Sequence, residues 1–220
     1  MTNDQPKSEL GDLPEPELNR STNSDAQPQP QPQPDRSWLL VALVFVGFWI
    51  VYLAFFAPGN RPPSLEGSAT NQPAEYGWTL EDLNEQSLRF TRFEGKTVFL
   101  NVWATWCPPC VGEMPSIAKL AANPRFKGKN IEFVCVSVDD SAATVRHYVA
   151  GKNWPMTVLH AQSLPRVFQT DGIPATFIIS PGGRIVAAEV GASDWDRPEV
   201  VSFLEKTAAA AKESSSSRPG

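Results

Sequence analysis

Cysteine is scarce in this chain of 220 residues, which contains three: Cys107, Cys110 and Cys135. Three cysteines are too few for the framework of roughly two to four disulfides that stabilises small secreted domains. Two of them form a Cys-x-x-Cys motif and the third stands alone. The count therefore predicts one reactive pair and one separate thiol.

Histidine is scarcer still, with His147 and His160 far apart in the sequence. A structural zinc site needs four ligands, usually two Cys-x-x-Cys pairs or one pair with added histidines. The chain has one such pair and no histidine placed to join it. We therefore expect no metal site and no cofactor, and we interpret both histidines as surface or structural residues.

Basic residues are not clustered, and the formal net charge is −5. Nucleic-acid binding needs a concentrated basic surface, and Lys127 with Lys129 fits a solvated turn, so no nucleic-acid partner is expected. Residues 1–36 are acidic, rich in Pro and Gln, and poor in aliphatic side chains. Such a segment buries too little apolar surface to offset the entropy of ordering, which predicts a disordered tail.

A long apolar run follows this tail: residues 38–57, WLLVALVFVGFWIVYLAFFA, contain no charge. A helix of this length spans about 30 Å, the hydrocarbon thickness of a bilayer. A buried helix of a soluble protein would show a polar face. A cleaved signal peptide would have a shorter apolar region and a small-residue cleavage site. The pattern favours an uncleaved transmembrane anchor over 37–57.

Arginines around the run predict its orientation, because cytoplasmic flanks carry an excess of basic residues. Arg20 and Arg36 precede the run and only Arg61 closely follows it. This asymmetry favours a cytoplasmic N-terminus and an extracytoplasmic domain on the periplasmic side of the cell membrane. Residues 58–75, rich in Pro, Gly, Asn and Ser, are expected to be a linker.

Residues 76–212 alternate between strand and helix patterns and precede a Ser-rich tail, 213–220, expected to be disordered. Lys96–Trp103 and Asn130–Val138 are almost wholly apolar, as in strands buried on both faces. The other expected elements are a helix from Cys107 to about Ala122, a helix capped by Asp139, Asp140 or Ser141 and ending near Ala150, a strand at Met156–His160, a short helix at Ser163–Gln169, a hairpin of Thr176–Ser180 with Arg184–Val190, and a helix from Asp196 to about Lys212. This order predicts an α/β sandwich with a mixed sheet.

The Cys-x-x-Cys motif lies where a strand is expected to pass into a helix. Free backbone N–H groups and the positive end of the helix dipole stabilise a thiolate at that position. The thiolate is the nucleophile of disulfide exchange. We therefore predict that Cys107 attacks and that Cys110, one turn later, resolves the mixed disulfide, so that the pair is a redox-active disulfide. Two unreactive helical thiols are the alternative.

Two prolines separate these cysteines, and proline has no N–H. Pro108 and Pro109 therefore remove two donors that would otherwise be available to the Cys107 sulfur, while the Cys110 N–H remains. Fewer donors predict a modestly lowered thiol pKa. Since strong oxidants owe their potential to a stabilised reduced form, this favours a reductant.

Several motifs in order, WATWCPPCVGEMP, VSVDD, GIPATFII and PGGRIV, resemble the thioredoxin superfamily, and most closely its TlpA/ResA branch of membrane-tethered thiol–disulfide oxidoreductases. The resemblance covers about residues 76–212. It implies a thioredoxin fold, with a mixed central sheet flanked by helices. It also implies a protein-disulfide oxidoreductase that reduces cysteine-containing protein substrates, often apocytochrome c or copper-site cysteines.

The resemblance also assigns roles to single residues. Pro174 matches the family's cis-proline, and the backbone of Ile173 matches the position that pairs with a bound substrate. Glu113 matches an acidic residue of this branch. It lies three residues after Cys110 and so on the same helical face, where partial burial would raise its pKa and suit it to accept the Cys110 proton. The alternatives are a trans loop proline and a solvated helix charge.

Trp106 is expected to shield the reactive sulfur or contact partners, whereas Trp103 and Cys135 are expected to be core residues. A redox or regulatory thiol is the alternative for Cys135. The leading function is a reductant recharged by a membrane dithiol protein. The alternatives are a disulfide-forming oxidase and a non-catalytic copper-binding module, while a peroxiredoxin is disfavoured because no Thr-x-x-Cys motif is present.

Overall fold

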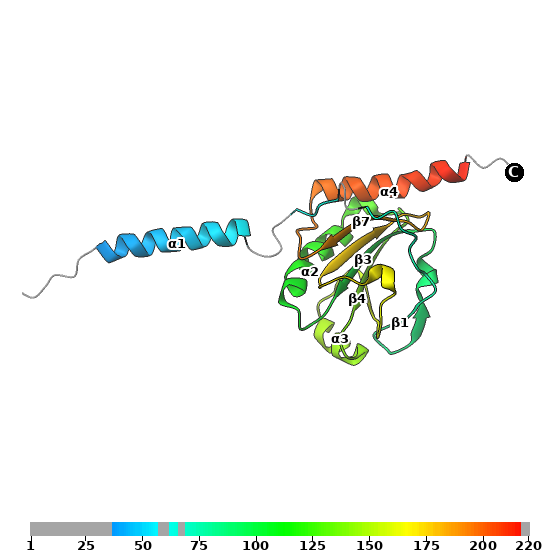
Figure 1. The fold of residues 1–220 in the computed structure, drawn as a ribbon, viewed down its shortest axis with the longest axis horizontal. Helices are drawn as coiled ribbons and strands as arrows, with labels where there is room; N and C mark the ends of the chain where they lie inside the picture. Colours follow the sequence, from blue (N-terminus) through cyan, green and yellow to red (C-terminus); the bar gives the residue numbers. More distant parts are fainter. Residues whose placement is uncertain (1–36, 57–61, 66–68, 217–220) are drawn as a thin grey trace, which may run out of the picture. The chain divides into compact units, whose positions relative to one another are not determined.

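The structure is a computed structural model that describes residues 37–56, 62–65 and 69–216. The expected disordered tail, 1–36, lies outside these residues, as do 57–61, 66–68 and 217–220 (Figure 1). Disorder in the tail therefore stays a prediction. Of the expected C-terminal tail, 213–216 belong to the last helix, which runs past Lys212.

Helix α1, Ser37–Phe56, forms from the uncharged run, which contains no proline to interrupt it. Its side chains are described as far as Tyr52, and large apolar ones such as Trp38 and Phe48 are exposed. Among the residues that the structure describes, no helix is both long and apolar enough to cross a bilayer. The anchor expected over 37–57 stays a prediction.

The domain is built on a seven-stranded sheet in the order β2-β1-β5-β4-β3-β6-β7 (Figure 1). The strands are β1 Thr79–Glu81, β2 Ser87–Arg89, β3 Thr97–Trp103, β4 Ile131–Ser137, β5 Thr157–His160, β6 Ala175–Ile179 and β7 Ile185–Val190. Strands β3, β4 and β5 are parallel, whereas β6 and β7 continue the sheet antiparallel on one side and β1 and β2 on the other. The predicted mixed sheet is confirmed.

Three further α-helices belong to the domain: α2 Pro108–Ala121, α3 Ala142–Val149 and α4 Pro198–Ser216. Single 3-10 turns cover Phe90–Phe93, Pro124–Phe126 and Arg166–Phe168. The short helix expected over Ser163–Gln169 is wrong in extent, since only the last of these turns forms. Pro165 explains the difference, because a proline disfavours helical conformation in the residue before it.

The core lies on both faces of β3, every residue of which is buried. Phe99 and Trp103 face a cluster that includes side chains of α2, α3 and α4. Leu100 and its alternate neighbours face a second cluster, which is covered by the segment before β3 and by the turn at Phe168. Burial on both faces explains why the sequence of β3 is largely apolar rather than alternating.

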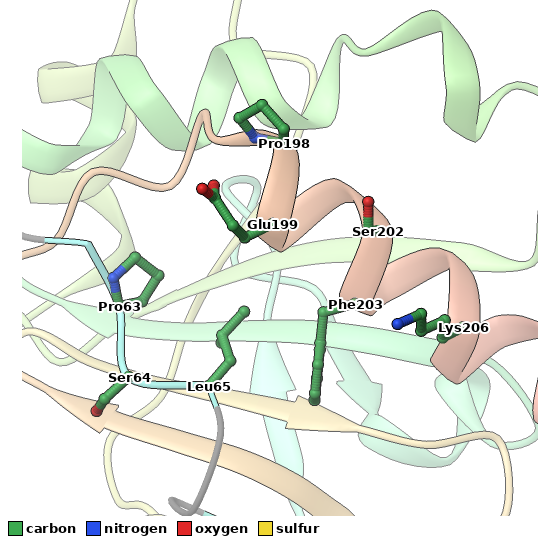
Figure 2. A pocket seen from close by; sticks show the side chains of 8 residues that line it. All are labelled: Pro63, Ser64, Leu65, Pro198, Glu199, Ser202, Phe203 and Lys206. Carbon is green, nitrogen blue, oxygen red and sulfur yellow. The ribbon is translucent and has the colours of Figure 1, made fainter.

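The described parts of the expected linker, 58–75, bind the hairpin of β6 and β7. Asn71 N donates to Ile185 O over 3.1 Å, and Ile185 N donates to Gln72 O over 3.0 Å. Nearer the N-terminus, Ser64 N donates to a carboxylate oxygen of Glu189 over 3.1 Å. A pocket of about 640 Å³ lies between this segment and α4 (Figure 2). Its lining residues are Pro63, Ser64, Leu65, Pro198, Glu199, Ser202, Phe203 and Lys206.

Candidate active site

Cys107 and Cys110 lie at the junction between β3 and α2, as the sequence predicts. Cys107 is the N-cap of α2 and Cys110 lies in its first turn. The two form a disulfide with a Cα–Cα distance of 5.3 Å. The exposed fraction is 4% for Cys107 and 0% for Cys110, so Cys107 is the more exposed of the two.

Two hydrogen-bonding groups approach the Cys107 sulfur among the described residues. Within the described residues one N–H donates to it, that of Cys110 over 3.3 Å, and the prolines between them supply none. The carbonyl oxygen of Ile173 lies 3.7 Å from the same sulfur. Because a disulfide sulfur carries no proton, this is a contact rather than a hydrogen bond in the oxidised form. A reduced thiol at this place has an acceptor for its S–H.

The Ile173–Pro174 peptide bond is cis, and it immediately precedes β6. Pro174 is buried, and its carbonyl accepts from Gly191 N over 2.8 Å. The fold thus brings Ile173, which is distant in sequence, against Cys107. Trp106 is 66% exposed directly before the reactive pair. The substrate-binding roles predicted for Trp106, Ile173 and Pro174 stay predictions, on positions that border the dithiol.

Glu113 lies on α2 three residues after Cys110 and is buried, with 1% of its surface exposed. Asn101 Nδ2 donates to its Oε1 over 2.8 Å, while Ser193 N and Trp195 Nε1 each donate to its Oε2 over 3.0 Å. Burial raises the pKa of Glu113 to about 7, with a smaller contribution from the Glu189 charge, and the three hydrogen bonds oppose the rise. The condition stated for Glu113, burial, is met, and the solvated helix charge considered as the alternative is not what the structure shows. The carboxylate makes no hydrogen bond to Cys110 within the described residues, and its proton-accepting role stays a prediction.

The partners of Glu113 were not predicted from the sequence. Asn101 could have been noticed, because it is a polar residue in a strand that is mostly apolar. In the structure it also donates to Thr176 Oγ1 over 2.9 Å. Ser193 and Trp195 gave none, because they follow β7 and reach Glu113 only through the fold. Asn101 Oδ1 and Ser193 Oγ are buried without a hydrogen-bond partner among the described residues.

Asp139 has a different role from the helix cap considered for it. Ser141 caps α3, with its hydroxyl accepting from Thr144 N over 3.2 Å. The Asp139 carboxylate instead accepts from Thr105 N over 3.0 Å and from Thr105 Oγ1 over 2.6 Å. Thr105 lies two residues before Cys107, so Asp139 holds the turn that carries the reactive cysteine.

His160 is buried next to this turn, which agrees with a structural role. Its Nε2 lies 2.8 Å from the backbone oxygen of Asp139, and because a carbonyl only accepts, Nε2 carries the proton. Its Nδ1 lies 3.2 Å from a carboxylate oxygen of Glu81. His147 is exposed on α3. The described residues contain no group of three or more His, Cys, Asp or Glu side chains placed to hold a metal ion.

Cys135 lies in β4, opposite Asn101 of β3 in the parallel register. It is fully buried and free. Burial raises the pKa of its thiol, and the nearby Glu113 charge raises it further. A thiol that stays protonated is a poor nucleophile. The predicted burial in the core is therefore confirmed, and this environment disfavours the alternative of a reactive thiol.

Comparisons with known proteins identify the family of this chain. The Redoxin family model matches residues 58–204. A thiol-disulfide oxidoreductase ResA from Bacillus subtilis is 31% identical over 158 residues, which cover 71% of this chain and 83% of the relative. A ResA from Bacillus thuringiensis is 28% identical over 170 residues, which cover 76% of this chain and 91% of the relative.

Solved structures share the fold. A crystal structure of a thioredoxin-family thiol:disulfide interchange protein from Chlorobium tepidum matches with a TM-score of 0.51 at 25% identity, covering 62% of this chain and 97% of its own. A solution structure of a thiol:disulfide interchange protein from a Bacteroides species matches with a TM-score of 0.51 at 26% identity, covering 66% and 94%. The chain therefore belongs to the Redoxin family of the thioredoxin superfamily and is a ResA-like protein-disulfide oxidoreductase.

Proposed function

We propose that this oxidoreductase works as a reductant of extracytoplasmic protein disulfides, with Cys107 as the attacking thiol and Cys110 as the resolving thiol. The observation that carries the proposal is the environment of the Cys107 sulfur, with one N–H donor at 3.3 Å and the Ile173 carbonyl oxygen at 3.7 Å. The greater exposure of Cys107 supports the order of the two thiols.

The proposed reaction begins with the reduced dithiol. The Cys107 thiolate attacks one sulfur of the substrate disulfide, and the other substrate sulfur leaves as a thiolate. Cys110 then loses its proton, to Glu113 in this proposal, and attacks the Cys107 sulfur. The substrate leaves as a dithiol after taking up protons, and two electrons have passed from the enzyme, which ends as the Cys107–Cys110 disulfide.

The direction follows from how well the reduced form is stabilised. Donors aimed at the Cys107 sulfur stabilise its thiolate and make a dithiol protein more oxidising. Pro108 and Pro109 withhold two such donors, and the Ile173 carbonyl favours a protonated thiol rather than a thiolate. Both effects limit ionisation of Cys107, so the reduced form gains little stability from a thiolate, which favours a reductant.

The reduction potential tests this direction. Equilibration of the full-length protein in glutathione buffers, followed by alkylation of free thiols and mass measurement, is expected to give a midpoint below about −220 mV. A Cys135→Ala variant serves as control and should give the same midpoint, because Cys135 is not part of the disulfide. A midpoint near −120 mV, typical of strong oxidants, would assign the disulfide-forming direction instead.

The proposal includes a membrane anchor over residues 38–57, with the N-terminus in the cytoplasm and the domain on the periplasmic side. Support comes from the uncharged apolar run, its helical conformation and the arginines that precede it. External protease is expected to digest the domain in intact spheroplasts, and deletion of 37–57 is expected to release the domain from the membrane fraction. If the protease digests the domain only after the spheroplasts are lysed, the orientation is opposite to the one proposed.

Cysteine-containing proteins are the substrates that this activity implies. Within the proposal, apocytochrome c and copper-site cysteines are the candidate substrates, and a second dithiol protein in the membrane returns the active site to its reduced form. A non-catalytic copper-binding module is the other candidate. It would bind copper tightly in the reduced state and show no exchange.

A further inference from the structure

The loop after β7 passes beneath α2 and contributes two donors to the same oxygen of Glu113. These are the backbone N–H of Ser193 and the indole N–H of Trp195, each 3.0 Å from Oε2. Trp195 is completely buried, and its ring meets Phe99 edge-on at a centroid distance of 5.0 Å. Its backbone N–H donates to Ser116 Oγ over 3.1 Å, which ties the loop to α2 a second time.

We propose that Trp195 is a positioning residue of the exchange reaction, whose indole N–H fixes the Glu113 carboxylate in its ionised form and directs an incoming proton to Oε1. This inference rests on the proposed role of Glu113 as the acceptor of the Cys110 proton. Trp195 itself touches neither cysteine nor substrate in the proposal, and it acts only through Glu113.

The chemistry of the donors carries the argument. An indole N–H and a backbone N–H can donate but cannot accept, so neither can receive a hydrogen bond from a protonated Oε2. A proton on Glu113 therefore belongs on Oε1, where the partner is the Asn101 side chain. An amide has both a donor and an acceptor end, and its orientation follows its partners.

Asn101 supplies the matching acceptor. In the ionised state its Nδ2 donates to Oε1, and its Oδ1 is buried with no partner among the described residues. A buried acceptor without a partner is costly. Rotation of the amide brings Oδ1 to a protonated Oε1 and to the Thr176 hydroxyl, both of which can donate to it, in place of the two bonds that Nδ2 makes in the ionised state. The oxygen that is unpaired in the ionised state is then the acceptor after proton transfer, while Nδ2 gives up both of its partners. The proton moves from the Cys110 sulfur to Glu113 Oε1 as Cys110 attacks Cys107.

The charges around Glu113 determine the pH dependence. The titratable groups that act on it are the Glu189 carboxylate from β7 and the Cys135 thiol from β4, and Cys110 precedes it by three residues on α2; Asn101, Ser193 and Trp195 are neutral. Burial raises the pKa of Glu113 to about 7 against the opposing effect of its three donors. Removing the indole donor raises the pKa further, so the carboxylate is ionised only at higher pH.

Trp195→Phe tests the proposal, because it keeps a large aromatic ring against Phe99 and removes the N–H. The measured quantity is the rate at which Cys110 releases a substrate thiol from a mixed disulfide on Cys107, recorded between pH 5 and 9 in the full-length protein. The midpoint of this profile is expected to rise by about one pH unit, with the high-pH plateau kept within a few-fold. Trp154→Phe is the matched control, since Trp154 is not among the hydrogen-bond donors to Glu113, and its midpoint should equal that of the wild type.

A second measurement uses the wild-type protein and does not depend on the fold of a variant. The indole Nε1–H resonance of Trp195 is expected to shift with pH at the same midpoint as the release rate, and the shift should vanish in Glu113→Gln. An unchanged midpoint in Trp195→Phe, or an indole resonance that ignores pH, overturns the role of Trp195.

The two proposals fail in different ways. If Glu113→Gln leaves the release rate and its pH profile unchanged, the proton-accepting role of Glu113 is wrong, and the inference about Trp195 falls with it. If Glu113→Gln slows release while Trp195→Phe leaves the midpoint in place, Glu113 keeps its role and only the inference about Trp195 is overturned.

Discussion

Replacement of Cys107 by serine is expected to lower the rate of disulfide exchange by at least about 1,000-fold, to the uncatalysed background. A serine hydroxyl at this position has no activating base and stays protonated at neutral pH, whereas a thiolate is the required nucleophile. The measurement is the initial rate of reduction of a protein disulfide, with a chemical reductant supplying electrons. Cys107 is the more exposed of the paired cysteines, and no other described thiol can replace it.

Cys135→Ala is the control for this variant. Cys135 is buried in β4, and burial raises the pKa of its thiol, so it contributes no thiolate at neutral pH. Its replacement is expected to change the exchange rate less than about two-fold, although the lost side-chain atoms will lower stability by about 1 kcal/mol. Substantial activity in Cys107→Ser, or its loss in Cys135→Ala, would show that the wrong thiol has been assigned.

Replacement of Glu113 by glutamine is expected to slow the resolving step by about 100-fold at neutral pH, a typical contribution of a general base. Glutamine keeps the size of the side chain and an acceptor for the Trp195 indole, but it cannot take a proton. The mixed disulfide on Cys107 should therefore accumulate, which thiol alkylation and mass measurement of a quenched reaction detect. Glu75→Gln, at an exposed position, is the control and should behave as the wild type.

The same variant changes how stability depends on pH. The pKa of Glu113 rises from 4.5 to about 7 in the folded protein, mainly through burial. The folded state therefore binds the proton more tightly than the unfolded state, and the resulting stability is complete below pH 4.5 and is lost as the pH rises to about 7. The difference is on the order of 3 kcal/mol. Glu113→Gln is expected to remove this slope from the free energy of unfolding between these pH values, and a slope equal to that of the wild type would contradict the buried environment described above.

The central elements could be predicted from the sequence because each is specified locally. β3 and β4 are mostly apolar, α2 begins with two prolines, and Ser141 supplies a helix cap. The reactive pair was found for the same reason, since its two cysteines lie one helical turn apart.

The sequence patterns did not predict the strands β1 and β2 at the edge of the sheet, because these segments carry little signal. Strands β1 and β2 have three residues each, too few to show alternation, and Leu80 is the single residue buried within them. Only the packed sheet specifies their conformation.

The residues that donate hydrogen bonds to Glu113 could not be predicted from the sequence, for a different reason. Ser193 and Trp195 lie about 80 residues from Glu113, and only the completed sheet brings their loop beneath α2. Asp139 was misread because a carboxylate before a helix usually caps it, whereas here the turn before Cys107 offers the Asp139 carboxylate two donors at once. Local sequence patterns do not encode these tertiary contacts.

Trapping with a Cys110→Ala variant tests the central claim most directly. Without the resolving thiol, the complex with a disulfide-containing protein substrate should persist, and peptide mass mapping should locate the linkage at Cys107. Recovery of a partner on Cys107, and its absence in the double variant Cys107→Ala with Cys110→Ala, is the predicted result. A linkage at Cys135, or no mixed disulfide with any cysteine-containing substrate, would contradict the account.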